Sequence, residues 1–230
     1  MGLLPKYKIE ELKREKREAK AAKKRKENTR SKIVRFLIVC EGSRTEPNYF
    51  QALVRDRYSE VRDEKIVGEG KSTCALVKRT LQIKDELERK RQLPFDRVWV
   101  VFDKDDFTDF NEAIKLAASY SFQSAWTNEA FELWYFLHFQ YLDAGISRHD
   151  YIEKLQSEIR KHPGYENYEY KKNDASVYKM LTTIGNEDLA KRYAERLRSF
   201  FEGDEDYKEH KPCTTVDLLV TELENPEKLL

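Results

Sequence analysis

The sequence lacks the features that mark secreted and membrane proteins. It has only three cysteines, Cys40, Cys74 and Cys213, without a CxxC spacing, so neither a disulfide framework nor a zinc site is predicted. No apolar run approaches the roughly 18 residues that a membrane span needs, and the basic N-terminal stretch lacks the apolar segment of a signal peptide. We therefore expect a cytoplasmic protein that does not associate with membranes.

Internal repeats and Gly/Ser-rich linkers are also missing. The 230 residues leave room for one domain of about 150 residues plus an extension. A charged fraction of 37% with 12% aromatic residues suits a folded domain with a well-solvated surface and argues against disorder throughout.

Positive charge is concentrated in an N-terminal basic arm, residues 1–32. Residues 1–35 hold 14 Lys and Arg against 5 Glu, although the whole chain carries only +1, so the rest of the chain is net acidic. The arm could neutralise nucleic-acid phosphates or form a solvated tail, and composition leaves both interpretations open. An acidic body is more typical of an enzyme that gathers carboxylates at a site than of a nucleic-acid coat.

Strand and helix patterns alternate from residue 33 to residue 140. Residues 35–40 (RFLIVC) and 97–102 (RVWVVF) are short apolar runs, typical of strands buried on both faces. Weaker strands are predicted at 65–67 and 121–126, and helical patterns follow the strands. This alternation predicts an α/β domain with a parallel sheet and helices on both faces.

The last part of the chain, residues 141–230, has no strong strand and is predicted to be a helical extension. Apolar residues recur there at helical spacing near 148–161, 174–183, 187–201 and 214–223. A tyrosine-rich stretch at 164–174 is predicted to be a loop. We favour packing as the role of its tyrosines, with base stacking as the alternative.

Carboxylates follow two of the predicted strands directly. Glu41 comes after the first strand, and Asp103 and Asp105 come after the third. Ligands of parallel sheets collect beyond the carboxyl ends of the strands, and residues two apart in a strand point to the same side. Carboxylate oxygens are the ligands that Mg²⁺ prefers, so Glu41, Asp103 and Asp105, with Asp106 beside them, are candidate ligands for Mg²⁺ or Mn²⁺.

Three motifs in this order resemble a known family. The segments CEGSRTEPNYF at 40–50, FDKDDF at 102–107 and WTNEAFELWYFLHF at 126–139 are similar to those of the RloB family, whose core resembles the TOPRIM fold. A fainter similarity lies in HKPCTTVDLLV at 210–220.

The resemblance implies a metal-dependent nuclease. It makes Glu41 the acidic residue after the first strand, and Asp103 and Asp105 the metal-binding pair. It also implies a role in phage defence, often beside an ATPase partner, with RNA, for example tRNA, or DNA as substrate. The alternative is a non-catalytic nucleic-acid-binding or ATPase-regulating subunit, and a homo-oligomer fits either function.

Basic side chains near these motifs are candidates for phosphate binding. Arg44 follows Glu41 by one turn, Lys104 lies between the aspartates, and Lys71 belongs to GEGKST at 68–73. That segment imitates a nucleotide-binding loop, but the motif needs glycine where Lys65 stands. Phosphate positioning is therefore the preferred role of Lys71.

Asn128 and Glu132 lie four residues apart in the third motif, a spacing that places side chains on one face of a helix. Asn128 is expected to cap the helix that follows it, or to support a ligand. Glu132 is a candidate to hold a metal ligand in place from outside.

Overall fold

The computed structural model describes residues 34–57, 65–70, 73–104 and 107–229, and within the basic arm residues 8, 10, 13–18 and 20. The chain divides into two compact units, Met1–Ile33 and Val34–Leu230. In the first unit, residues 13–18 are helical and Arg14 and Glu18 form an exposed ion pair at 3.5 Å. Most of the basic arm lies outside the described residues, so its binding to nucleic acid stays a prediction.

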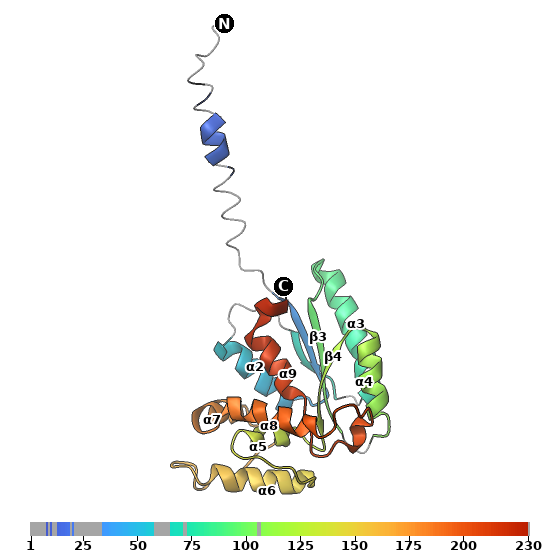
Figure 1. The fold of residues 1–230 in the computed structure, drawn as a ribbon, viewed down its shortest axis with the longest axis vertical. Coiled ribbons are helices and arrows are strands. Elements are labelled where there is room, and N and C mark those ends of the chain that lie inside the picture. Colours follow the sequence, from blue (N-terminus) through green and yellow to red (C-terminus); the bar gives the residue numbers. More distant parts are fainter. Residues whose placement is uncertain are drawn as a thin grey trace. The chain divides into compact units, whose positions relative to one another are not determined.

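A four-stranded parallel sheet forms the centre of the second unit (Figure 1). Its strands are β1 (Phe36–Cys40), β2 (Lys65–Gly68), β3 (Arg97–Lys104) and β4 (Gln123–Asn128), in the order β2-β1-β3-β4. Every pair of neighbouring strands is parallel, and the predicted α/β class is confirmed. The chain leaves β1 for β2 on one side and then returns past β1 to β3, so the strand order reverses between β1 and β3.

Helices cover both faces of this sheet, and further helices follow it. In chain order they are α2 (Thr45–Arg57), α3 (Thr73–Arg91), α4 (Phe110–Ser119), α5 (Glu132–Leu137), α6 (Arg148–Ile159), α7 (Val177–Ile184), α8 (Glu187–Ser199), η1 (Tyr207–Glu209), α9 (Val216–Glu224) and η2 (Pro226–Leu229).

The period-two alternation of β1 divides the core between the two faces. Ile38 and Cys40 pack into the cluster on the side of α2 and α9, whereas Leu37 and Val39 pack into the cluster on the side of α3 and α4 (Figure 1). All four side chains are fully buried, because successive strand residues point to opposite faces. Burial on both faces explains why this strand is an unbroken apolar run.

The C-terminal helices complete the core on one face and at one end of the sheet. Helices α5, α6, α7 and α8 gather beyond one end of the strands in Figure 1. Residues on both sides of position 140, such as Trp134 and Leu155, belong to a single cluster. The two parts of the chain thus share one hydrophobic core. The predicted boundary at 140 between a domain and an extension stays a prediction.

The structure corrects two local predictions, the start of β4 and the helix cap at Asn128. β4 begins at Gln123 and not at 121, because Ser121 takes a positive φ of 59° that an extended strand cannot contain. Asn128 ends β4 and does not cap α5, whose N-cap position is Phe131.

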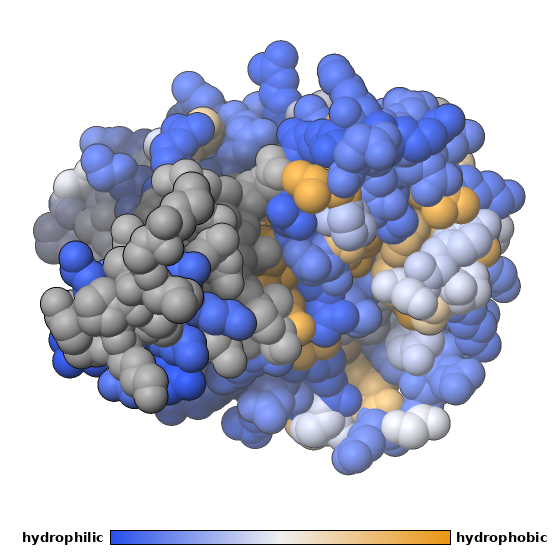
Figure 2. Space-filling model, turned by 90° about the horizontal axis from the view of Figure 1, so that it is seen from above, coloured by the Kyte–Doolittle hydropathy of each residue, from blue (hydrophilic) through white to orange (hydrophobic). Residues whose placement is uncertain are grey.

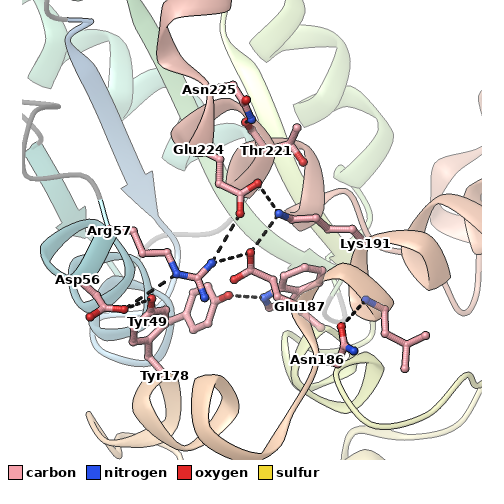
Figure 3. Close-up of polar contacts among 12 residues, drawn as sticks. Tyr49, Asp56, Arg57, Tyr178, Asn186, Glu187, Lys191, Thr221, Glu224 and Asn225 are labelled. Atoms are coloured by element: carbon pink, nitrogen blue, oxygen red, sulfur yellow. Dashed lines mark hydrogen bonds and ion pairs between the residues drawn. The ribbon is translucent and has the colours of Figure 1, made fainter.

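A cluster of charged side chains joins α2 to α8 and α9 (Figure 3). The Arg57 guanidinium lies 2.9 Å from Glu187 Oε1 and 3.6 Å from Glu224 Oε1, and Lys191 Nζ lies 3.0 Å from Glu187 Oε1. The two carboxylates are thus each compensated by cations, which is the condition for burying charge without a large penalty. This cluster fixes α2, whose first turn borders the pocket described below, against the C-terminal helices.

The face shown in Figure 2 is mainly hydrophilic, with small, separate apolar spots among the coloured atoms. Such scattered apolar residues are normal on a protein surface. No helix in the part of the chain that the structure describes is long and apolar enough to cross a membrane.

His138 is buried and its ring has a hydrogen-bond partner. It is 3% exposed and its Nδ1 lies 2.9 Å from the Trp134 carbonyl oxygen. Burial lowers the pKa of His138 from 6.5 to about 4, since the charged ring would lose its hydration. The neutral ring therefore contributes stability that is complete above pH 6.5 and is lost as the pH falls towards 4.

We predict that His138→Gln flattens the pH dependence of the free energy of unfolding between pH 6.5 and about 4. The wild-type protein should lose up to about 1.4 kcal/mol more per pH unit than the variant in this range. Urea unfolding at a series of pH values measures the difference. His149→Gln, at a position whose side chain is 78% exposed, should keep the wild-type slope. An unchanged slope in His138→Gln would contradict the prediction.

Candidate active site

A pocket of about 260 Å³ lies at the carboxyl ends of β1 and β3. This is where the strand order reverses, the usual position of ligand sites in open parallel sheets. Its walls come from the loop after β1, the start of α2, the end of β3, the start of α5 and α6, and the loop between α6 and α7. The lining residues are Glu41, Gly42, Ser43, Arg44, Thr45, Glu46, Gly70, Asp103, Phe131, Glu132, Arg148, Lys172 and Asn173.

The topology brings Glu41 and Asp103 together at this pocket. The backbone N–H of Glu41 donates to Val101 O at 2.8 Å, which continues the pairing of β1 with β3 by one residue. In return, the backbone N–H of Asp103 donates to Glu41 Oε2 at 3.2 Å. The Asp103 Oδ2 atom accepts from the backbone N–H of Phe131 at 3.1 Å. The two carboxylates that the sequence singled out are thus held at one edge by strand geometry.

Glu46 is a third carboxylate in the pocket, and the sequence analysis missed it. It lies in the first turn of α2 and is only 6% exposed. Its Oε2 atom is buried and has no hydrogen-bond partner among the described residues, a state that costs about 1–3 kcal/mol. A side chain at Gly42 would overlap the Glu46 carboxylate, which explains why a glycine follows Glu41.

Glu132 supplies a fourth carboxylate from the first residue of α5. It is 3% exposed, and its Oε1 atom accepts a hydrogen bond from the Tyr170 hydroxyl at 2.8 Å. Tyr170 belongs to the loop between α6 and α7, so this bond connects that loop to the pocket. Glu132 therefore faces the pocket, and its role in holding a metal ligand in place stays a prediction.

The crowding of these groups shifts their protonation. Burial raises the pKa of Asp103 well above its usual value, and repulsion by Glu46 and Glu132 adds to this effect. Burial likewise raises the pKa of Glu46, again with a contribution from Glu132. Like charges that share a desolvated site disfavour ionisation of one another. The electrostatic field of the pocket therefore favours the binding of a positive charge.

Cationic side chains at the pocket compensate part of the negative charge. Arg148 Nη2 lies 3.7 Å from Asp103 Oδ2 and lowers the pKa of Asp103. Lys172 and Arg148 also lower the pKa of Glu46. Arg44 is exposed at the pocket wall. Neither Arg148 nor Lys172 was singled out in the sequence, because both come from segments that only the tertiary fold brings to the sheet.

The remaining predicted residues divide into two groups. Asp105, Asp106 and Lys71 lie outside the described residues. Lys104 and Asn128 are described and do not line the pocket. Lys104 follows Asp103 in β3 and so points to the opposite face of the sheet, whereas the Asn128 side chain donates to Lys208 O at 2.9 Å.

The backbone at position 128 is also held by the C-terminal segment, since Asn128 N–H donates to Cys213 O at 2.9 Å. The neighbouring Thr127 forms an antiparallel bridge with Thr214. Asn128 thus holds the C-terminal segment against the edge strand, and it is not among the described residues that line the pocket.

The donor set at the pocket suits a hard divalent cation. Carboxylate oxygens are the preferred ligands of Mg²⁺, and the unpartnered Glu46 Oε2 atom is a buried acceptor of the required kind. Within the described ranges, however, no group of three or more His, Cys, Asp or Glu side chains is arranged to hold a metal ion. A complete set of ligands would therefore need a contribution from Asp105 or Asp106, or a rearrangement of the described carboxylates.

The sequence carried a signal for Glu46, because it lies inside the motif at 40–50, five residues after Glu41. Tyr170 and Lys172 belong to the tyrosine-rich stretch at 164–174, but nothing in the sequence placed that stretch beside Asp103, some 70 residues earlier.

Comparison with known proteins agrees with these motifs. The family model described as RloB-like protein matches residues 36–223, which span the whole sheet and all four carboxylates of the pocket. No curated protein and no solved structure gives a significant match. Since the model covers most of the chain, this protein belongs to the RloB-like family.

Proposed function

We propose that this protein is a divalent-metal-dependent nuclease that cleaves phosphodiester bonds in RNA or DNA. The observation that carries the proposal is the convergence of Glu41, Glu46, Asp103 and Glu132 on one pocket at the reversal of the strand order. Crowded carboxylates raise the free energy of the folded state unless a cation joins them, and such strain is typical of functional sites. Membership of the RloB-like family is consistent with this function.

Glu41 and Asp103 would hold Mg²⁺ or Mn²⁺, together with Asp105 or Asp106. A bound divalent cation supplies charge stabilisation for the phosphate oxygens and activates water for attack on phosphorus. Glu46 is suited to take a proton from the attacking water, because its pKa is raised from 4.5 and a base works best when its pKa approaches the working pH.

Positive side chains around the carboxylates would position the substrate. Arg44 and Lys172 line the pocket on its exposed side and can contact phosphate oxygens. Gly70 also lines the pocket, and its backbone N–H donates to Glu41 O at 2.9 Å, which brings the segment that leads to Lys71 beside the site. We assign phosphate positioning to this side of the pocket.

The cellular role that we propose is phage defence, in association with an ATPase, and self-assembly into a homo-oligomer is part of the same proposal. RNA, for example tRNA, and DNA are both retained as substrates of the proposed reaction. Support for this part of the proposal comes from family membership alone.

One observation favours a second function, that of a non-catalytic subunit which binds nucleic acid or regulates an ATPase. Asp103 already has a cationic neighbour in Arg148 at 3.7 Å, as in a purely structural ion pair. This alternative predicts nucleic-acid binding that survives loss of Asp103 and disappears when residues 1–32 are deleted.

We predict that Asp103→Asn stabilises the protein in the absence of divalent cations and abolishes stabilisation by Mg²⁺. Because the pKa of Asp103 is raised, its ionised form opposes folding at neutral pH. The neutral amide should therefore raise the free energy of unfolding by about 0.5–2 kcal/mol. This gain should shrink as the pH falls and the wild-type carboxyl takes up its proton.

Urea unfolding with EDTA and with excess Mg²⁺ measures both effects, because a ligand that binds only the folded state stabilises it. Asp143→Asn, at an exposed position outside the pocket, should behave as the wild type does. Equal stabilisation of wild type and Asp103→Asn by Mg²⁺ would remove Asp103 from the metal site.

Glu41→Gln and Asp103→Ala are each expected to reduce cleavage at least about 100-fold, since each removes a group on which charge stabilisation depends. Purified protein is incubated with tRNA, plasmid DNA and single-stranded DNA in Mg²⁺ or Mn²⁺, alone and with a candidate ATPase partner. Asp143→Asn serves as the active control. Cleavage that is unchanged in Asp103→Ala refutes the assigned site. Cleavage by none of these mixtures, with binding retained in Asp103→Ala, supports the non-catalytic subunit.

A further inference from the structure

The loop between α6 and α7, residues 160–176, separates the acidic pocket from a second cavity. Lys172 and Asn173 line the acidic pocket, whereas Lys171 and Asp174 line a cavity of about 340 Å³. Neighbouring residues of a chain are only about 3.8 Å apart, so little more than the width of this loop divides the two spaces. The second cavity is within the size range of small-ligand pockets, about 300–1,000 Å³.

Hydrogen bonds hold this loop firmly beside the pocket. On one side, Asn48 Nδ2 donates to Asn173 O at 3.3 Å, and the Thr45 hydroxyl donates to Lys172 O. On the other side, Arg160 Nε donates to Tyr168 O at 2.8 Å. With the bond from Tyr170 to Glu132, these contacts give the second cavity a defined position relative to the carboxylates.

Aromatic and basic side chains line the second cavity. The rings of Tyr165 and Tyr168 lie 6.4 Å apart at an angle of 62°. Both pack partly on the core, in agreement with the packing role expected for this segment, yet both are half-buried and also line the cavity. Lys171 and Lys179 are exposed at its rim. Flat rings beside lysines are the usual means of binding unpaired nucleotides.

The ring of Tyr168, and not its hydroxyl, is the part available to a base. The side chain is half-buried and lines the cavity, whereas its hydroxyl oxygen is shielded from solvent. Of the two carboxylates at this cavity, Asp174 already accepts from Ser176 N–H at 2.8 Å, and Glu169 is exposed.

We propose that the second cavity receives the base of an unpaired nucleotide adjacent to the phosphate in the acidic pocket, so that the substrate is a single-stranded segment. The inference rests on the proposed nuclease function and defines its substrate class. An unpaired strand can place a phosphate among the recessed carboxylates and turn the neighbouring base onto Tyr168. A duplex would first have to unstack and unpair that base.

The test measures the binding of labelled oligonucleotides to the full-length protein by fluorescence anisotropy in the presence of Ca²⁺. One strand is used unpaired, annealed to its complement, or as a sugar–phosphate chain of equal length without bases. The wild-type protein should bind the unpaired strand at least tenfold more tightly than the other two probes. Tyr168→Ala should lose about tenfold on the unpaired strand alone and no longer distinguish it from the chain without bases.

Three further variants separate stacking from structural effects. Tyr168→Phe keeps the ring and should retain most of the preference. Tyr120→Ala, at a tyrosine on the end of α4 that is 37% exposed, should bind as the wild type does. If Tyr168→Ala does not fold, Lys171→Gln combined with Lys179→Gln changes only exposed positions and should weaken binding of the unpaired strand and its salt dependence.

Equal wild-type affinity for the unpaired strand and the duplex overturns the inference, and so does an equal loss on both probes in Tyr168→Ala. Cleavage of the same probes in Mn²⁺ separates this result from the proposed function. Equally fast cleavage of the duplex and the unpaired strand contradicts the inference but supports the nuclease function. A Tyr168-dependent preference without cleavage of any probe supports the second cavity and counts against the nuclease.

Discussion

The pairing of β1 with β3 is the constraint on which the site depends. Because both strands are parallel and buried on both faces, their carboxyl ends meet at one edge, and the chain must leave that edge in opposite directions. The hydrogen bond from Asp103 N–H to Glu41 Oε2 at 3.2 Å is the direct consequence, since it joins residues 62 positions apart. Glu46, Glu132 and the loop with Lys172 and Tyr170 are arranged around this pair.

The site brings together carboxylates that repel one another and that only the fold holds in proximity. Burial and mutual repulsion raise the pKa values of Asp103 and Glu46, while Arg148 and Lys172 reduce the excess of negative charge only in part. Such a pocket lowers the stability of the folded protein and is retained where a cation or a substrate restores the balance. In the charged cluster of Arg57, Glu187, Lys191 and Glu224, by contrast, two cations lie against two carboxylates.

Sequence reasoning succeeded where local pattern determines structure and failed where distant segments meet. The runs before Glu41 and Asp103 predicted two buried strands and hence the edge on which both residues lie. The roles of Lys172 and Tyr170 could not be predicted, because their positions depend on how the loop between α6 and α7 packs against α2 and α5. The expected helix cap at Asn128 was wrong for a related reason. The C-terminal segment at 213–215 bonds to the end of β4 and keeps it extended to that residue.

The claim that carries most weight is that the pocket between β1 and β3 binds a divalent cation. The most direct measurement is an anomalous-scattering map from crystals of the full-length protein grown with Mn²⁺. Our account predicts a peak within coordination distance of the Glu41 and Asp103 carboxylates, with Asp105 or Asp106 beside it. A well-ordered pocket without a peak, in which Arg148 still lies against Asp103, would contradict the account.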